Sequence, residues 1–229
     1  MAIYDQTLAL LNGLPAGTPA GLLLRHSTRY PILSEEDVFQ AALTPEGIKQ
    51  AEELGVELGR GWRLGRLLSS PVGRCVDTAA AIARGAGWRE TPNTEFRLSH
   101  PHIEPVWEAM PHVEFRLSEP HIEPVWDAMP LRWPDCALPA QVEAVINLVL
   151  EDPAGPGSLD LFVTHDTILA VIAGIFTGHI FRWPDYWPDY LEGIILWRSG
   201  DGLHLRWRDD EKVIGAWPQP AAGQLRLGF

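Results

Sequence analysis

The sequence predicts an α/β fold, a three-layer sandwich in which a mostly parallel central sheet is flanked by helices and interrupted by a lid insertion. Three observations support this prediction. Short apolar runs end abruptly in polar clusters, helical patterns lie between and after these runs, and a tandem duplication separates two of them. Strands that alternate with helices are typical of a sheet covered on both faces.

Three apolar runs have the length of strands, and each ends in polar residues. They are residues 21–29 (GLLLRHSTR), 66–74 (RLLSSPVGR) and 159–167 (LDLFVTHDT). Continuous apolar strands are what a sheet buried on both faces requires. Near the C-terminus, GIILWR and LHLRWR flank SGDG, and this pattern predicts a half-exposed hairpin.

Helix signals follow each of these runs. Thr44 and Ser70 are each followed by proline, which predicts an N-cap and a first helical residue at both places. Gly85 is expected to end the second of these helices. Residues 137–152 repeat the one-sided apolar pattern, whereas residues 166–178 are apolar nearly all round and predict a buried helix.

Composition limits the class of protein. The 229 residues are 46% hydrophobic and 21% charged, as in one soluble globular domain spanning residues 1–229. A net charge of −12 argues against a nucleic-acid partner, so an anionic ligand must be held by a local pocket. We find no signal peptide and no apolar stretch of membrane-spanning length, and we therefore expect a cytoplasmic protein without a membrane partner. Cys75 and Cys136 are interpreted as buried thiols rather than as a disulfide scaffold.

The polar residues at the three strand ends should meet, because ligands bind beyond the carboxyl ends of such strands. Arginines hold phosphate oxygens through charge-assisted hydrogen bonds, and a neutral imidazole can act as a nucleophile toward phosphorus. A carboxylic acid beside a doubly charged phosphate has its pKa raised, so it stays protonated and can donate to the leaving oxygen. The strand ends carry Arg25, His26, Arg29, Ser69, Ser70, Arg74, His165 and Asp166.

At this point the sequence resembles the histidine phosphatase superfamily, which includes phosphoglycerate mutases and histidine acid phosphatases. The resemblance implies that His26 is the phosphorylated nucleophile, and that Arg25, Arg74 and His165 surround the transferred phosphoryl group. It also implies that neither a metal nor an organic cofactor is needed. The motifs that carry it are LLLRHSTRYP, LTPEGIKQAEELG, LLSSPVGRCVDTA and VTHDT, which together span about residues 21–178.

Details of these motifs refine the resemblance. Arg29 and the His165–Asp166 pair look more like the acid-phosphatase branch, in which the Asp after the second His donates the proton. Ser27 stands where the motif has glycine, so its side chain either narrows the phosphate pocket or donates a further hydrogen bond. We therefore predict Arg29, Ser27 and Ser70 as substrate-binding residues.

A 19-residue duplication is the most unusual feature of the chain. Residues 93–111 and 112–130 differ at only four positions, and they lie within a predicted lid at about residues 90–136. In the family, this region sets substrate choice, so the duplication is expected either to change the opening of the pocket or to form a surface excursion. A smaller doubling, WPDYWPDY, spans Trp183–Tyr190, and its prolines exclude a strand interior.

Side chains of the lid leave alternatives open. Glu95 or Glu104 is an alternative proton donor to Asp166, since some family branches take it from this region. The repeated His and Glu pairs have ligand types that suit a metal, but duplication creates such pairs automatically, and we predict no metal site. The tryptophans either form a stacking platform for a sugar or base or pack the lid. They are Trp107, Trp126, Trp133, Trp183 and Trp187.

These observations predict a phosphomonoester hydrolase that acts through a phosphohistidine on a small phosphorylated substrate. A phosphomutase of the same superfamily is the nearest alternative. A phospholigand-binding module with impaired catalysis is the alternative from another class, motivated by Ser27 and the doubled lid. The sequence does not identify the substrate or the oligomeric state.

Overall fold

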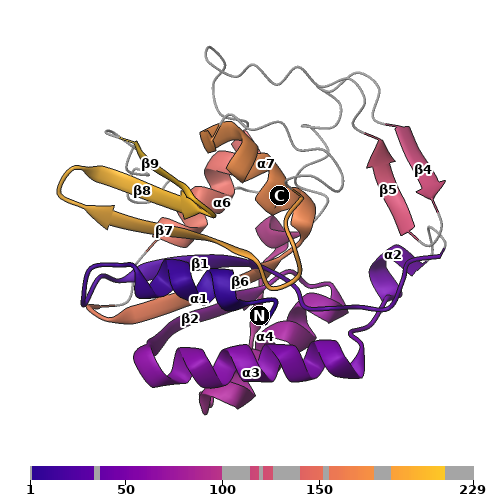
Figure 1. The fold of residues 1–229 in the computed structure, drawn as a ribbon, viewed down its shortest axis with the longest axis horizontal. Coiled ribbons are helices and arrows are strands. Elements are labelled where there is room, and N and C mark those ends of the chain that lie inside the picture. Colours follow the sequence, from indigo (N-terminus) through magenta and orange to yellow (C-terminus); the bar gives the residue numbers. More distant parts are fainter. Residues whose placement is uncertain are drawn as a thin grey trace.

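A mixed β-sheet with helices on both faces forms the body of the molecule in the computed structural model (Figure 1). The structure describes residues 2–33, 37–99, 114–118, 121–125, 140–151, 155–177 and 187–214. For residues 114–118 and 121–125, the description covers the backbone alone. The predicted α/β fold class is confirmed by this arrangement.

The central sheet has seven strands in the order β3-β2-β6-β1-β7-β8-β9. β1, β2, β3 and β6 are parallel to one another, whereas β7, β8 and β9 each pair antiparallel with the strand before them in this order. The strands are β1 Ala20–Arg25, β2 Arg63–Ser69, β3 Asn93–Thr94, β6 Ser158–Thr164, β7 Gly193–Ser199, β8 Gly202–Trp207 and β9 Asp210–Ile214.

The predicted C-terminal hairpin is confirmed as β7 and β8, and β9 extends it. β9 was not predicted, because its sequence DEKVI lacks an apolar alternation and its residues are exposed or half-buried. A charged strand of this kind suits the edge of a sheet, where it discourages pairing with another chain.

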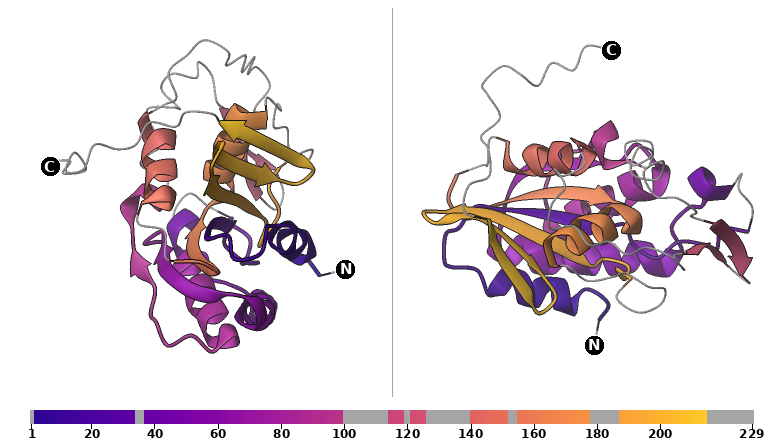
Figure 2. Two further views of the ribbon diagram at one scale, coloured as in Figure 1. Left: turned by 90° about the vertical axis from the view of Figure 1, so that its left-hand side faces the viewer. Right: turned by 90° about the horizontal axis from the view of Figure 1, so that it is seen from above.

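The helices form one layer on each face of the sheet (Figure 2). α1, α3 and α4 bury apolar side chains against one face, and α6 and α7 against the other. α7 is buried nearly all round, as its sequence predicts. The helices are α1 Asp5–Asn12, α2 Asp37–Gln40, α3 Pro45–Gly61, α4 Gly73–Ala86, α6 Ala140–Leu150 and α7 Asp166–Thr177, with a 3₁₀ turn η1 at Phe96–Leu98.

The ends of α4 differ from the prediction. The helix begins at Gly73 rather than at Pro71, because the Ser70 hydroxyl accepts a hydrogen bond from the Val72 amide and holds this stretch in a bend. It ends before Gly87, which adopts the left-handed conformation with φ 71°. Gly85 therefore lies inside the helix and does not end it.

Part of the predicted lid is described. β3 and η1 belong to the first copy of the duplication, and β4 (Glu114–Ser118) pairs with β5 (His121–Val125) in a separate two-stranded sheet within the second copy. Residues 100–113, 119–120 and 126–139 lie outside the described residues, so the lid over residues 90–136 stays a prediction. None of the described helices combines the length and the apolar character needed to cross a bilayer.

Candidate active site

The carboxyl ends of three neighbouring parallel strands meet at one edge of the sheet. β6 lies between β1 and β2, and Arg25 pairs with Thr164 at the last position of both strands. The His26 amide donates to the Thr164 carbonyl at 2.9 Å, and the Ser70 amide donates to the Val163 carbonyl at 2.8 Å. The predicted strand-end residues therefore come together.

His26 is held in one tautomer. Its Nδ1 donates to the Ser27 carbonyl at 2.8 Å, because a carbonyl oxygen can only accept. Its Nε2 accepts from the Nε of Arg74 at 3.0 Å, so the lone pair of the ring lies on Nε2. Burial, and then the charges of Arg74 and Arg25, hold the pKa of His26 well below its usual range. The side chain is thus a neutral imidazole with a basic nitrogen facing a cation.

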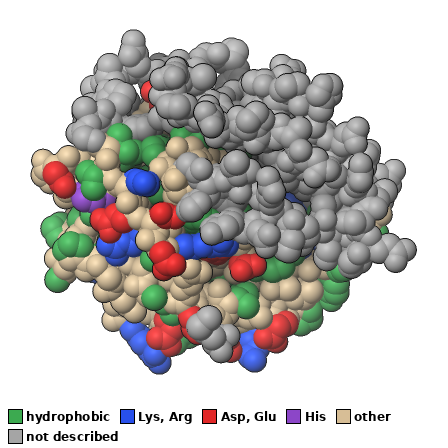
Figure 3. Space-filling view, turned by 45° about the horizontal axis from the view of Figure 1, so that its top comes forward, with side chains coloured by type: hydrophobic (Ala, Val, Ile, Leu, Met, Phe, Trp, Pro, Cys, Tyr) green, Lys and Arg blue, Asp and Glu red, His purple; other side chains and the backbone are tan. Residues whose placement is uncertain are grey.

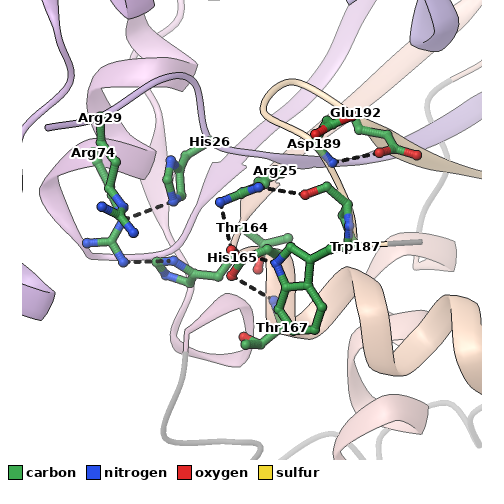
Figure 4. A network of polar contacts seen from close by, with 12 residues as sticks. Arg25, His26, Arg29, Arg74, Thr164, His165, Thr167, Trp187, Asp189 and Glu192 are labelled. Carbon is green, nitrogen blue, oxygen red and sulfur yellow. Dashed lines mark hydrogen bonds and ion pairs between the residues drawn. The ribbon is translucent and has the colours of Figure 1, made fainter. Parts of the chain in front are cut away.

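His165 lies beside His26, with the two ring centroids 5.7 Å apart in an edge-to-face arrangement. Arg74 bridges the rings, since its Nη2 donates to His165 Nδ1 at 3.2 Å (Figure 4). His165 Nε2 donates to the Ser70 hydroxyl at 3.0 Å. Both histidines are almost completely buried, so water does not screen the guanidinium between them.

Arg25 and Asp166 form an ion pair between a buried guanidinium and a partly buried carboxylate, with Arg25 Nη2 2.7 Å from Asp166 Oδ2. The same oxygen accepts from the indole nitrogen of Trp187 at 3.2 Å, and Oδ1 accepts from the Thr167 amide at 2.9 Å. Burial raises the pKa of Asp166, but the charge of Arg25 and the smaller effects of His26 and Trp187 outweigh it and bring this pKa below its usual range. Asp166 is therefore ionised in this structure, and the prediction of a raised pKa applies only once a phosphate is bound.

Arg29 lies on the same side of His26 as Arg74 (Figure 4). It is partly buried, and its Nη1 donates to the Tyr30 carbonyl at 2.9 Å. Arg25, Arg29 and Arg74 thus place three positive charges around one histidine. Such a cluster suits an anion with several oxygens.

Ser27 is placed differently from what the motif suggested. Its hydroxyl donates to the Gly47 carbonyl at 2.7 Å, and its amide donates to the Thr78 hydroxyl at 3.0 Å. The residue is fully buried, and it is not among the residues with positive φ. The side chain therefore joins β1 to the start of α3 and does not point into the cluster of arginines. Substrate binding by Ser27 gains no support from this geometry.

Gly47 and Thr78 are structural parts of the site that the sequence reasoning missed. A Cβ on Gly47 would lie 2.0 Å from the Thr28 carbonyl oxygen, so only glycine fits where α3 approaches the loop after His26. Thr44 caps the same helix, since its hydroxyl accepts from the Gly47 amide at 3.0 Å as predicted. The motif LTPEG signalled a helix start, but the contact of its glycine depends on tertiary structure.

The alternative proton donors are placed only in part. Glu95 follows β3 at the same edge of the sheet, and its amide donates to the Ser69 carbonyl at 2.8 Å. Its carboxylate pairs with Arg97 at 2.8 Å. Glu104 lies outside the described residues, as do Cys136 and four of the five tryptophans named above. The fifth, Trp187, is 5% exposed and packs beside Asp166.

The described part of the surface carries no broad cationic area on the face in Figure 3, where acidic and basic side chains are interspersed. Among the described residues, no group of three or more His, Cys, Asp and Glu side chains is arranged to hold a metal ion. His102 and the side chains of His121 and Glu123 lie outside the description. At the carboxyl ends of β1, β2 and β6, Arg25, Arg29 and Arg74 form a local cluster of positive charge.

A family model described as histidine phosphatase superfamily (branch 1) matches residues 23–207. The expectation from Arg29 and the His165–Asp166 pair, which favoured the acid-phosphatase branch, gains no support from this match. No curated protein matches the chain significantly.

Solved structures of low sequence identity share the fold. The mycobacterial glucosyl-3-phosphoglycerate phosphatase is 18% identical, with 86% of this chain and 99% of that chain covered and a TM-score of 0.52. YhfR of Bacillus stearothermophilus is 20% identical, with 83% and 96% covered and a TM-score of 0.53. A phosphoglycerate mutase from Bacillus anthracis is 13% identical, with 87% and 94% covered and a TM-score of 0.50.

Proposed function

Because the chain belongs to the histidine phosphatase superfamily, we propose that it is a phosphomonoester hydrolase acting through a phosphohistidine on a small phosphorylated substrate. One observation carries this proposal. A neutral, buried His26 presents the lone pair of Nε2 to Arg74, with Arg25 and His165 beside it. A nucleophile facing a cationic pocket suits attack on a phosphorus atom whose oxygens are negatively charged.

The proposed reaction has two steps. In the first, His26 Nε2 forms a bond to phosphorus while the bond between phosphorus and the leaving oxygen breaks, and an acid protonates that oxygen. In the second, water attacks the phosphohistidine, the P–N bond breaks, and the proton of the water returns to the acid. Arg25, Arg74 and His165 stabilise the charge on the phosphoryl oxygens throughout, and Arg29 and Ser70 contribute to binding.

Asp166 is the proposed acid, and Arg25 governs its protonation. A bound phosphate dianion attracts Arg25 and repels the carboxylate, and both effects raise the pKa of Asp166 from its lowered resting state. Glu95 and Glu104 remain alternatives for this role.

A quenched reaction tests the intermediate. Wild type, His26→Ala and the control His204→Ala, whose histidine lies on β8 away from this site, are incubated with an aryl phosphate from pH 4 to 8 and examined by mass spectrometry. We expect turnover and an acid-labile adduct on His26 in wild type and in the control, and neither in His26→Ala. Folded wild type without turnover or adduct would overturn the proposal and favour a phospholigand-binding module. Turnover that depends on a second, acceptor substrate would identify a phosphomutase.

Metal independence is part of the same proposal, because three arginines already supply the positive charge that a metal would provide. Turnover is expected to be unchanged after dialysis against a chelator. A loss of activity that a divalent cation restores would contradict this. A cytoplasmic location also belongs to the proposal and is supported by the low cysteine content of two in 229 residues.

A further inference from the structure

The second copy of the WPDY doubling lies against the site, although its sequence predicted no role in catalysis. Trp187 is 5% exposed and donates from its indole nitrogen to Asp166. Tyr190 is partly exposed, and its ring centroid lies 5.7 Å from that of His26. The segment Trp187–Glu192, named here the clamp segment, therefore touches both the proposed nucleophile and the proposed acid.

The clamp segment encloses the guanidinium of Arg25. Arg25 Nη1 donates to the Pro188 carbonyl at 2.6 Å, and its Cζ lies 4.1 Å from the ring centroid of Tyr190. The opposite edge of the group pairs with Asp166, and the backbone amide of Arg25 donates to the Glu192 carbonyl at 2.9 Å. These contacts restrict the orientation of the guanidinium before any ligand binds. The group therefore loses little conformational entropy when it binds a phosphate.

Within the part of the chain that the structure describes, one donor of Arg25 has no protein partner. Its Nε is buried and makes no hydrogen bond among the described residues, and the side chain as a whole is only 7% exposed. An unpaired buried donor costs free energy, and a ligand oxygen that pairs with it recovers that cost. The guanidinium of Arg25 is thus held in place, and its Nε is still able to donate a hydrogen bond to an anion.

The clamp segment is itself anchored from the turn between β8 and β9. Arg208 donates to both carboxylate oxygens of Glu192, at 2.6 and 3.0 Å, and to the Trp187 carbonyl at 2.9 Å (Figure 4 shows Glu192 and Trp187). The Glu192 side chain is 4% exposed and also accepts from the Asp189 amide at 2.7 Å. Leu191 and Arg208 have φ of 56° and 51°, an uncommon conformation for residues other than glycine. Arg208 belongs to the ion pair and Leu191 directly precedes its partner Glu192, so both uncommon backbone conformations lie at or beside this contact.

We propose that the clamp segment positions Arg25 for the phosphoryl group, with Tyr190 and Trp187 as positioning residues and Arg208 as their anchor. The inference rests on the proposed function, because it requires an anion at Arg25. It assigns to the second WPDY copy, Trp187–Tyr190, a role in shaping the anion pocket.

Phosphate affinity tests the proposal independently of turnover. The dissociation constant for inorganic phosphate is measured by calorimetry, together with kcat and KM for an aryl phosphate, for wild type, Tyr190→Leu and Tyr190→Phe. Loss of a cation–π contact of about 0.5–2 kcal/mol is expected to weaken phosphate binding and raise KM by roughly 2- to 30-fold in Tyr190→Leu. Tyr190→Phe keeps the ring and should recover most of that affinity.

A variant outside the site tests the same proposal without changing a residue that contacts Arg25. Arg208→Gln keeps the Arg25 and Tyr190 side chains but removes the anchor of the segment that positions them, and it is expected to raise both KM and the phosphate dissociation constant. Equal phosphate affinity in wild type, Tyr190→Leu and Arg208→Gln, all shown to be folded, overturns the clamp while leaving the proposed function intact. If wild type binds phosphate without hydrolysing esters, the proposed function fails. The phosphate dissociation constants of wild type and the variants then test the role of the clamp segment by themselves. If wild type binds no phosphate, both fail.

Discussion

Ser27 shows how a single residue can depart from a motif without entering the site. The motif glycine suggested that a side chain at this position would crowd the phosphate or bind it. In the structure, the hydroxyl turns toward Gly47 and ties the loop after β1 to α3. A serine is tolerated here because its backbone does not need positive φ and the Gly47 carbonyl offers an acceptor.

Replacing Ser27 by glycine is therefore expected to reduce stability and leave turnover nearly unchanged. Loss of a buried hydrogen bond and the added chain entropy should together lower the free energy of unfolding by about 1–2 kcal/mol. Chemical denaturation and kcat/KM for an aryl phosphate measure the two effects. Ser27→Ala, which removes only the hydroxyl, separates the hydrogen bond from the entropy. A large rise in kcat/KM in Ser27→Gly would show instead that the serine obstructs the pocket.

The role of Asp166 as the acid can be tested by substitution. If it protonates the leaving oxygen, Asp166→Asn should lower kcat by about 10²–10⁴ for an alkyl phosphate and much less for a nitrophenyl phosphate, whose leaving group needs no proton. The measurement is the ratio of kcat for the two substrates, compared between wild type and Asp166→Asn. An equal loss for both substrates would point to a role in holding Arg25, and Glu95→Gln would then be assayed in the same way.

At the scale of the element, the packing of α3 on α4 depends on small residues. A Cβ on Gly55 would lie 2.1 Å from the Ile82 carbonyl oxygen, and one on Gly85 would lie 2.0 Å from the Glu52 carbonyl oxygen. Gly85, which the sequence suggested as a helix stop, is thus a contact between two helices. This packing supports the site, since α4 carries Arg74 and α3 contacts Ser27.

Gly55→Ala should therefore destabilise the protein although alanine favours helix formation. Overpacking costs about 1–3 kcal/mol, which exceeds the gain of about 1 kcal/mol in helix propensity. Gly61→Ala in the same helix is the matched control, because a Cβ there meets nothing within 4 Å. The midpoint of thermal unfolding is expected to be lower in Gly55→Ala than in wild type. In Gly61→Ala it should equal or exceed that of wild type. A Gly55→Ala protein as stable as the control would contradict such close helix packing.

The β7–β9 sheet edge carries a pH-dependent contact remote from the site. His204 Nε2 lies 2.9 Å from Asp201 Oδ1, and its Nδ1 lies 3.3 Å from Glu211 Oε1. Burial lowers the pKa of His204, but these two carboxylates outweigh it and raise the pKa above its usual value. A histidine with a raised folded pKa stabilises the fold fully below its unfolded pKa of about 6.5, and the contribution is lost as pH rises through the folded value.

The stability difference between wild type and His204→Gln should accordingly shrink as pH rises from 5.5 to 9. The Asp201 side chain is 65% exposed and that of Glu211 is 40% exposed, so water screens both carboxylates and the total contribution is small. Denaturation curves at the two pH values measure it. A difference that stays constant across this range would show that the cluster is not ionised as described.

At the scale of the whole molecule, the two copies of the duplication differ in how they relate to the central sheet, which the first copy joins through β3. β4 and β5 pair only with each other, and none of the described strands of the second copy joins the central sheet. The identical sequence EFRLS forms a 3₁₀ turn after Glu95 in the first copy and a strand in the second. In the first copy it is bound to the core, since the Thr164 hydroxyl donates to the Leu98 carbonyl at 2.8 Å.

Deleting either copy should therefore preserve the fold. Proteins lacking residues 112–130 or residues 93–111 differ from each other at only four positions. Each should unfold cooperatively with stability equal to or slightly above wild type, because halving a loop lowers its closure cost by about 0.6 kcal/mol. Calorimetry measures this, and kcat/KM for small and large phosphate esters shows whether the insertion limits access. Loss of cooperative unfolding in both deletions would show that the second copy belongs to the core.

The sequence by itself determined β1, β2, β6, β7 and β8, the helices α3, α4, α6 and α7, and the identity of the strand-end residues, because apolar periodicity and capping are local properties. The edge strands β3 and β9 were not predicted, because neither carries an apolar pattern. It placed Arg25, His26, Ser70, Arg74, His165 and Asp166 at the ends of strands or the starts of helices that the structure brings together. Only the tertiary structure decided that the Ser27 hydroxyl bonds to Gly47, that Gly85 packs against α3 and that Pro188 and Tyr190 contact Arg25. Hydrogen-bond partners, burial and the resulting pKa values depend on residues distant in the chain, and for that reason EFRLS adopts two conformations in one molecule.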